Sequence, residues 1–437
     1  MEVFLVKALQ LVLALSILVI VHEFGHFIFA RIFKVRVEKF YLFFNPWFSL
    51  FKFKPKNSDT EYGVGWLPLG GYVKIAGMID ESMDKEQMAL PAQPWEFRSK
   101  SAFARLMIMI GGVLFNFILA IIIYAAIAFH WGDTYLPLKN VTAGMEFGEV
   151  ALGAGFKNGD ILIAVDNEPI EKLDIQRIGE AQHVTVLRNG ENVILDMPND
   201  LMQQIIAANT WFAHERVPFV INTILKESNA AKAGLMANDS VISVAGIATP
   251  SQVEVTKILA DHKGESLDFS FYRSGELLNL PVSISSEGTI GVGLKNPAQL
   301  YDLVNKKYTL FEAIPAGISK GVDRLSGYVS SLKYVFTKEG AQSVGGFVAI
   351  GNIFPSVWNW RAFWELTAFL SIMLGFMNIL PIPALDGGHV LFLLFEVITR
   401  RKPNEKFMEY AQLTGMALLF GLLIFANGND LFKLFFK

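Results

Sequence analysis

The sequence of 437 residues contains no cysteine, which excludes disulfide bonds, thiolate metal ligands and a cysteine nucleophile. Charged residues are few, at 18% of the chain, and the formal net charge is only −3. Because the chain has no overall basic character, we expect no nucleic-acid partner. Hydrophobic residues make up 52% of the sequence, which predicts an integral membrane protein with a substantial water-soluble part.

The N-terminus also lacks the features of a cleaved signal peptide. Lys7 is the only basic residue before the first apolar run, and no small-residue cleavage site follows it. We therefore expect this segment to be retained as a membrane span.

A metal-binding pattern, His22-Glu23-Phe24-Gly25-His26, lies within the first apolar segment. Residues four apart share one helix face, so both imidazoles could bind one Zn²⁺, with Glu23 beside the metal-bound water as general base. HExxH also occurs by chance in charged helices, but residues 8–21 carry no charge. Ionisable side chains are costly at membrane depth and are usually functional there. The pattern predicts a zinc protease that cuts peptide bonds inside or beside the bilayer.

Four segments are long and apolar enough to cross a membrane. We expect these transmembrane helices at residues 1–34, 103–130, 362–396 and 407–426. Lys and Arg are concentrated between the first two spans and between the last two, which predicts that both loops are cytoplasmic. The long region between the second and third spans would then lie on the opposite side of the membrane.

The first loop, residues 35–102, has the sequence pattern of strands rather than of a flexible tail. Residues 35–75 are rich in Val, Phe, Tyr and Gly, with apolar and charged residues alternating at their start. Glycines in this segment, including Gly70 and Gly71, allow tight turns and close backbone approach. We expect a membrane-associated β-rich loop that lines a cavity or is covered by protein, because lipid leaves open strands unpaired.

The region between the second and third spans contains an internal repeat. The repeated segments are 154–160 and 233–239, each followed by an apolar strand and later by Arg-x-Gly, at 188–190 and 273–275. This pattern resembles the PDZ domain, although an unrelated β-rich domain with a similar turn is the alternative. We expect α+β PDZ-like domains at 131–214 and 215–300, and amphipathic connecting helices at 301–361.

Two histidines cannot hold a catalytic zinc, which needs about three protein ligands and an open position. Asp386 is the only carboxylate in the stretch 366–395, and a carboxylate buried there needs a positive partner. Pro381 and Pro383 break the helix in this span and free backbone polar groups. We favour Asp386 as the third ligand, with His389 as the alternative.

Together these motifs resemble one family. The chain resembles the bacterial site-2 protease family, RseP type, in four features that occur in the same order. These are HExxH, the segment 65–72, the tandem PDZ-like units and the pattern NxLPxPxLDGGH at 378–389. The resemblance implies a membrane-embedded zinc endopeptidase with His22, His26 and Asp386 as ligands and Glu23 as base.

The resemblance also implies a cellular role. It suggests an enzyme of the bacterial inner membrane, with PDZ domains on the periplasmic side that act as a size filter. Its substrates would be single-span membrane proteins of the anti-sigma-factor type, after a first cut by a site-1-type protease, and remnant signal peptides. Lipid bilayer and membrane-protein substrates are thus the expected partners.

Some positions are expected to contact substrate, and others depart from the family pattern. The residues that we expect at the substrate are Asn378, Pro381, Pro383, Asn116, Gly70 and Gly71. Met373 stands where many family members have Asn, so Asn378 or Asn116 would have to bind the substrate backbone instead. Asn116 could alternatively be a helix-packing residue beside a glycine pair. Residues 345–346, Gly-Gly, replace the usual Gly-Pro.

Two other functions fit parts of the pattern. A catalytically silent membrane scaffold would use only the PDZ pair, and a metal transporter would use His22, His26 and Asp386 as a transit site. The intact HExxH with Asp386 argues against a scaffold, and Glu23, placed to activate water, argues against a transporter.

Overall fold

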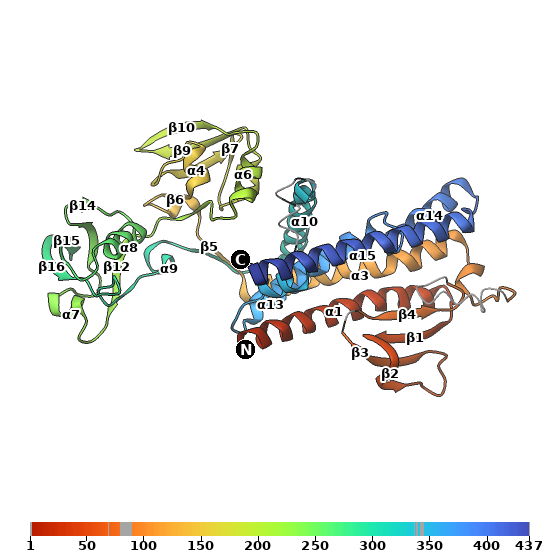
Figure 1. Ribbon diagram of the computed structural model, residues 1–437. Coiled ribbons are helices and arrows are strands. Elements are labelled where there is room, and N and C mark those ends of the chain that lie inside the picture. Colours follow the sequence, from red (N-terminus) through yellow and green to blue (C-terminus); the bar gives the residue numbers. More distant parts are fainter. Residues whose placement is uncertain are drawn as a thin grey trace. The chain divides into compact units, whose positions relative to one another are not determined.

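The computed structural model describes residues 2–68, 70–78, 90–335, 337, 340 and 345–436. The chain divides into two compact units, which we call the membrane unit and the repeat unit (Figure 1). The membrane unit comprises Met1–Gly132 and Lys307–Lys437, and the repeat unit comprises Asp133–Lys306. Each unit is built around its own buried apolar clusters.

Long helices form most of the membrane unit. They are α1 (Glu2–Ile32), α3 (Ala102–Trp131), α10 (Leu310–Val335), α12 (Phe347–Ile353), α13 (Trp360–Ile379), α14 (Asp386–Thr399) and α15 (Glu405–Phe436); the short η1 (Phe97–Ser99) precedes α3. Helix α3 is central, because it packs against α1, α10, α13 and α14. Among the described residues, four helices are long and apolar enough to span a membrane: α1, α3, α13 and Lys406–Lys433 within α15.

The predicted third span, residues 362–396, consists of two helices in the structure. Helix α13 ends at Ile379 and α14 begins at Asp386. Pro381 and Pro383 lie between them; proline cannot donate a backbone hydrogen bond, and its ring disfavours a helical conformation of the residues before it. The break therefore places Asp386 at the first position of a helix rather than in the middle of one.

A four-stranded sheet follows α1 in the chain. Its strands are β1 (Val37–Leu42), β2 (Phe44–Phe53), β3 (Glu61–Leu67) and β4 (Tyr72–Ile75), in the spatial order β2-β3-β1-β4. Strand β1 pairs in parallel with β3 and antiparallel with β4, and both β1 and β4 pack against α1. The strands predicted for residues 35–75 are therefore present, and β4 is the outer strand beside α1.

The repeat unit contains two α+β repeats with the same order of elements, except that the first has an additional helix, α6, before its last strand. The first repeat comprises β6 (Met145–Phe147), α4 (Glu149–Gly153), β7 (Ile161–Val165), β8 (Glu168–Pro169), α5 (Ile175–Gly179), β9 (His183–Arg188), β10 (Glu191–Asp196), α6 (Leu201–Ala208) and β11 (Ala213–Glu215). The second comprises β12 (Phe219–Ile224), α7 (Asn229–Ala233), β13 (Ser240–Val244), β14 (Ile247–Ala248), α8 (Gln252–Asp261), β15 (Ser266–Arg273), β16 (Glu276–Ser283) and β17 (Val292–Leu294). The pairing β10-β9-β7-β8 in the first corresponds to β16-β15-β13-β14 in the second, and β6-β11 corresponds to β12-β17. The internal repeat in the sequence is therefore a repeat of structure.

Each repeat is stabilised by the same buried ion pair. Asp160 is bonded by Arg188 at 2.6 Å and Asp239 by Arg273 at 2.7 Å, and both carboxylates are almost fully buried. These hydrogen bonds raise the pKa of each guanidinium above its usual value. The Asp of the repeated segment and the Arg of Arg-x-Gly, noticed separately in the sequence, are thus one interaction.

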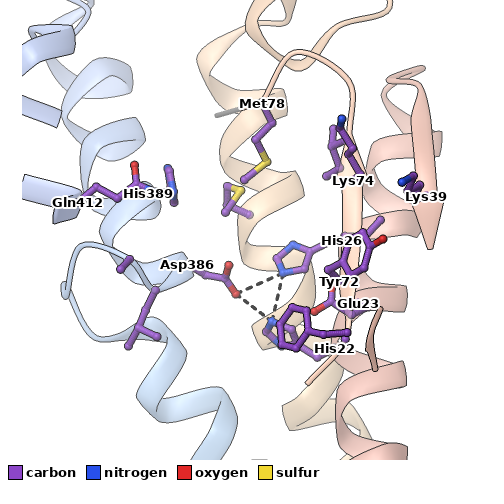
Figure 2. Close-up of a pocket in the computed structure, with 17 residues that line it drawn as sticks. His22, Glu23, His26, Lys39, Tyr72, Lys74, Met78, Asp386, His389 and Gln412 are labelled. Atoms are coloured by element: carbon purple, nitrogen blue, oxygen red, sulfur yellow. Dashed lines mark hydrogen bonds and ion pairs between the residues drawn. The ribbon is translucent and has the colours of Figure 1, made fainter. Parts of the chain in front are cut away.

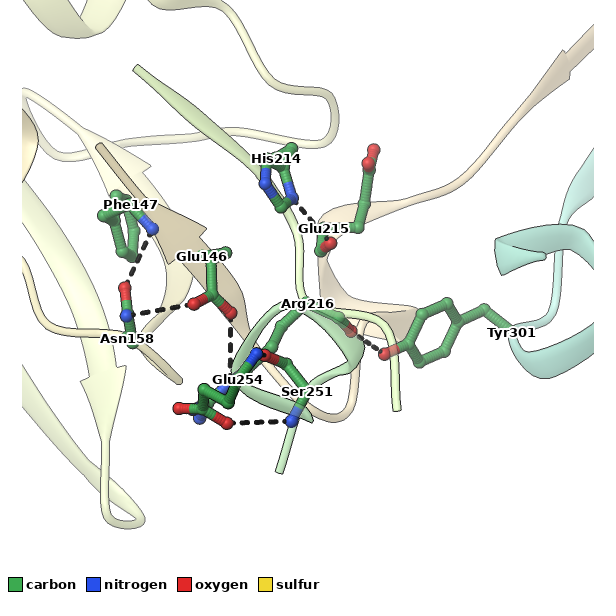
Figure 3. Close-up of polar contacts among 9 residues, drawn as sticks. All are labelled: Glu146, Phe147, Asn158, His214, Glu215, Arg216, Ser251, Glu254 and Tyr301. Carbon is green, nitrogen blue, oxygen red and sulfur yellow. Dashed lines mark hydrogen bonds and ion pairs between the residues drawn. The ribbon is translucent and has the colours of Figure 1, made fainter. Parts of the chain in front are cut away.

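The two repeats are joined at a short junction, residues 216–218, that is bonded on both sides (Figure 3). The Arg216 guanidinium lies 3.3 Å from Glu146 of the first repeat and 2.7 Å from Glu254 of the second. The chain then returns: Tyr301, which follows the second repeat, packs in the core of the first and donates a hydrogen bond to the Arg216 carbonyl. The two repeats are therefore linked by two chain segments and a shared arginine.

The remaining elements close the repeat unit. They are β5 (Asp133–Tyr135), η2 (Leu138–Asn140), α9 (Pro297–Leu300) and β18 (Val304–Lys306). Strands β5 and β18 pair antiparallel, so the two ends of the repeat unit leave it together.

Candidate metal centre

Glycines bring α1 and α3 into backbone contact and so position the two histidines. A Cβ at Gly25 would overlap the carbonyl of Gly111, and a Cβ at Gly111 would lie 2.7 Å from the Gly25 carbonyl. A Cβ at Gly112 would overlap His26 Nε2 and lie 2.7 Å from His22 Cε1. Small residues allow membrane helices to approach this closely. Both imidazoles therefore lie directly against the backbone of α3.

A folded-back loop brings Asp386 to the histidines. This loop, residues 380–385, joins α13 to α14 and returns closely on itself. A Cβ at Gly387 would overlap the Leu380 carbonyl, and one at Gly388 would lie 2.6 Å from Pro383 Cα. The spacing in LPxPxLDGG thus has a structural reason: the prolines follow the end of α13, and the glycines at the start of α14 leave room for the loop to fold back.

The structure brings together the donor atoms of His22, His26 and Asp386 (Figure 2). Asp386 Oδ2 lies 3.0 Å from His22 Nε2 and 3.3 Å from His26 Nε2, and the two nitrogens are 3.2 Å apart. Tetrahedral zinc with bonds of about 2.0–2.1 Å separates its ligand atoms by about 3.3 Å. The three atoms therefore have the mutual spacing of a zinc ligand set.

Hydrogen bonds on the far side of the rings determine which nitrogens face the centre. His26 Nδ1 lies 2.9 Å from the Ile108 carbonyl, so Nδ1–H donates there and leaves the lone pair of Nε2 facing inward. His22 Nδ1 lies 3.1 Å from the side-chain amide of Asn116. If that amide presents Oδ1, which has no other hydrogen-bond partner among the described residues, His22 also donates through Nδ1 and turns Nε2 inward.

A cavity of about 490 Å³ opens onto these donor atoms. Its lining includes Glu23 from α1, Tyr72 and Val73 from β4, and Gly71 directly before that strand. The general base candidate and an outer strand of the sheet thus border the same space as the donor atoms.

The other predicted site residues lie at different distances from this cavity. Asn378 Nδ2 is 3.4 Å from His22 Nε2, and Gly70, at φ +151°, directly precedes the lining residue Gly71. Pro381 and Pro383 lie in the loop before Asp386. Asn116 is fully buried behind His22 and is not part of the cavity lining.

His389, the alternative third ligand, lines the cavity from α14 but is not part of the converging donor cluster. Other lining residues were not identified from the sequence. Lys39, Lys74 and Gln412 also line it. Lys74 directly follows the sequence Gly-Gly-Tyr-Val at 70–73, whose glycines were expected at the substrate. This proximity in the chain was the one feature of the sequence that could have indicated Lys74 as a lining residue.

The donor set fits zinc. Two imidazoles and a carboxylate form a common catalytic zinc set, and they leave a fourth position for water. Asp386 Oδ2 is buried and, apart from the two imidazole nitrogens, has no hydrogen-bond partner among the described residues, as expected of an atom that shares a cation with them. With Glu23 beside the set and apolar helices long enough to span a membrane around it, the arrangement has the features expected of a membrane-embedded, metal-dependent hydrolase.

Comparison with known proteins identifies the family. Residues 10–422 match Peptidase family M50, and the chain belongs to this family. This confirms the resemblance to site-2 proteases and establishes the chain as a zinc metalloprotease of a bacterial membrane.

The chain is also similar over nearly its full length to curated proteins. It is 29% identical to a putative zinc metalloprotease of Vibrio cholerae, with 97% of this chain and 98% of the relative covered. It is 28% identical to the regulator of sigma-E protease RseP of Escherichia coli, with 99% of each covered. Among solved structures, the PDZ domain of an SdrC-like protein from Listeria monocytogenes covers 18% of this chain and 90% of its own, at 21% identity and a TM-score of 0.16. At that TM-score, a PDZ assignment depends on the repeats themselves.

The contact between Asn116 and His22 predicts a role for Asn116 in zinc affinity. Asn116→Ala should weaken zinc binding by about 10–100-fold, because loss of a partner that orients a ligand costs that much. Asn116→Asp should retain tight binding, since a carboxylate also accepts the Nδ1–H bond. Zinc affinity is measured by chelator competition on the purified protein.

Asn352→Ala, a change of the same kind at an exposed position, is the control and should leave zinc affinity unaltered. Equal zinc affinity in Asn116→Ala and the wild type would show that Asn116 does not orient His22.

Proposed function

We propose that this protein is an intramembrane endopeptidase that cleaves the transmembrane segments of single-span substrates. The observation that carries the proposal is the convergence of His22, His26 and Asp386, with Glu23, on a cavity among apolar helices. In this proposal the first three residues hold zinc. When bound, zinc supplies an acidified water and polarises the substrate carbonyl. Glu23 takes the proton of that water and returns it to the leaving amine.

Asn116 and Asn378 have different proposed roles. Asn116 holds His22 in the tautomer that a metal ligand requires, as its buried contact supports. Asn378 lies 3.4 Å from His22 Nε2, close enough for its amide to bind the substrate backbone beside the scissile bond. Pro381 and Pro383 shape the neighbouring loop, whose backbone is not held in a helix.

Loss of the general base tests the catalytic assignment. Glu23→Gln should lower cleavage of a tagged single-span substrate lacking its outer domain by at least about 10²-fold, because proton transfer would lose its acceptor. Bound zinc should remain, since Glu23 is not one of the proposed ligands. Cleavage is followed on gels and zinc by metal analysis.

Glu287→Gln, at an exposed position in the repeat unit, provides a matched control. Equal cleavage by Glu23→Gln and the wild type would contradict the assigned base. If Glu23→Gln still transports metal and neither it nor the wild type cleaves the substrate, the protein is a transporter. If the wild type and Glu23→Gln both bind zinc but neither cleaves the substrate, a scaffold is favoured.

We further propose that an extended substrate segment pairs with strand β4. A transmembrane helix hides its amides in internal hydrogen bonds, so cleavage requires local unwinding. Within the described residues, only β1 pairs with β4, and Gly71, Tyr72 and Val73 line the cavity beside Glu23. The outer edge of β4 can therefore receive a substrate strand and satisfy its freed backbone groups.

Disrupting the sheet tests this pairing. Replacing residues 62–72 with a helix-favouring sequence should abolish cleavage while zinc stays bound, because the ligands come from α1 and α14. Cleavage assays and zinc analysis on the same preparation separate the two effects. Retained cleavage would rule out the sheet as the substrate template.

We assign the domains and topology as follows. Residues 131–214 and 215–300 form two PDZ-like domains, as their corresponding strand pairings and duplicated Asp–Arg pair support. Residues 35–102 form a cytoplasmic, membrane-associated loop, consistent with the 89% exposure of Trp47 on strand β2. The PDZ-like domains then face the periplasm from the inner membrane and admit anti-sigma-type substrates trimmed by a site-1-type protease, or remnant signal peptides.

Removing the filter tests the role of the PDZ-like domains. Replacing residues 137–302 with a short Gly-Ser turn keeps the paired strands β5 and β18 and removes both repeats. The variant should cleave single-span substrates that retain their outer domain, which the wild type should reject. Cleavage of trimmed and untrimmed substrates is compared directly, and unchanged selectivity would exclude the filter.

A further inference from the structure

Two lysines face the cavity outside the proposed metal site. Apart from Glu23 and Asp386, the described lining residues that carry a full charge are Lys39 and Lys74. In Figure 2 both lysines lie beyond His26, farther than it from His22. They therefore occupy the end of the cavity nearer the C-terminus of α1.

The lysines are neighbours across two strands. Lys39 of β1 is directly opposite Lys74 of β4 in the antiparallel register. Like charges directly opposite in a sheet repel each other, so this pairing costs stability unless anionic groups offset it. Glu38 lies 3.5 Å from Lys74, and Glu61, next to Lys39 on β3, accepts a hydrogen bond from Tyr41. A further carboxylate entering the cavity would be attracted by both ammonium groups.

The position of the lysines on the sheet indicates which part of a substrate would meet them. This step depends on the proposed pairing of substrate with β4. A strand advances about 3.3 Å per residue, and Lys74 is one residue beyond Val73, which borders the cavity beside Glu23. A substrate side chain within about three residues of the scissile bond would therefore lie beside the lysines. In the proposed topology these residues are on the cytoplasmic side of the bond.

Membrane proteins commonly carry Lys or Arg at the cytoplasmic ends of their spans. Such residues would bring a third positive charge into a partly desolvated cavity, where repulsion is stronger than in water. A carboxylate in the same place would instead be attracted. The lysine pair can thus discriminate among substrate transmembrane segments by the sign of one charged side chain near the scissile bond.

We propose that Lys39 and Lys74 form a specificity subsite. It favours substrates with an Asp or Glu side chain within about three residues of the scissile bond on its cytoplasmic side, and it disfavours Lys or Arg there. The ligand chemistry is a carboxylate of the substrate, bound by two ammonium groups.

The test measures preference rather than activity alone. Purified full-length protein is given single-span substrates that differ only in having Glu, Gln or Lys at one of these positions, and kcat/KM is determined for each. The wild type should prefer Glu over Lys by about fivefold or more, as expected for a difference of about 1 kcal/mol in charge interaction. Lys39→Gln/Lys74→Gln should bring this ratio to about one, and Lys39→Glu/Lys74→Glu should reverse it.

The control is Lys52→Gln on the exposed strand β2, which should keep the wild-type ratio. Equal kcat/KM of the wild type for all three substrates would overturn the subsite while leaving the protease intact. An absence of cleavage of every substrate would instead overturn the proposed function. If the double Gln variant loses activity on all substrates equally, and only in vesicles with anionic phospholipid, the lysines bind a lipid phosphate and the proposal fails.

Discussion

The close packing of α1 against α3 is the contact on which the candidate metal centre depends. Gly25 and Gly111 lie backbone to backbone, and Gly112 faces the imidazoles without any side chain between them. This approach lets the Ile108 carbonyl and Asn116, both on α3, reach the outer nitrogens of His26 and His22. A larger side chain at any of these glycines would separate the helices and remove the hydrogen bonds that direct the inner nitrogens toward Asp386.

The surroundings of the site allow ionisable side chains to lie among apolar helices. Ionisable groups in a membrane are tolerated when they face protein or an aqueous cavity and bind one another. Here the donor atoms lie within about 3.3 Å of each other and face a cavity bordered by the sheet. The broken helix before Asp386 supplies non-helical backbone beside this cavity, which Ala384 and Leu385 help to line. The candidate ligands, Glu23 and the edge of the sheet therefore border one cavity.

The repeat unit is stabilised by contacts of a different kind. Each repeat has its own core and its own buried Asp–Arg pair, so each is stabilised locally. Their mutual arrangement depends on Arg216, which bonds carboxylates of both repeats, and on Tyr301, which returns to the first core. The short junction between the repeats is therefore bonded from both sides, by side chains far apart in the chain.

The sequence by itself determined much of this protein. HExxH predicted two ligand candidates because helical periodicity fixes which residues share a face, and hydropathy predicted the apolar helices because the bilayer sets their length. The repeat was visible because its turn residues and Asp recur at fixed offsets. Asp386 could be nominated because a lone carboxylate in an apolar span demands a partner, although the chain alone left His389 as an alternative.

Only the tertiary structure decided which distant residues meet. The contact of Asn116 with His22, the pairing of Asp160 with Arg188 and the lysines opposite each other on β1 and β4 all join positions far apart in the chain. Sequence spacing specifies neighbours within a helix or strand, but strand register and helix contacts are set by packing across the whole unit. For that reason the chemistry of the centre was foreseeable, whereas the residues that orient it and border its cavity were not.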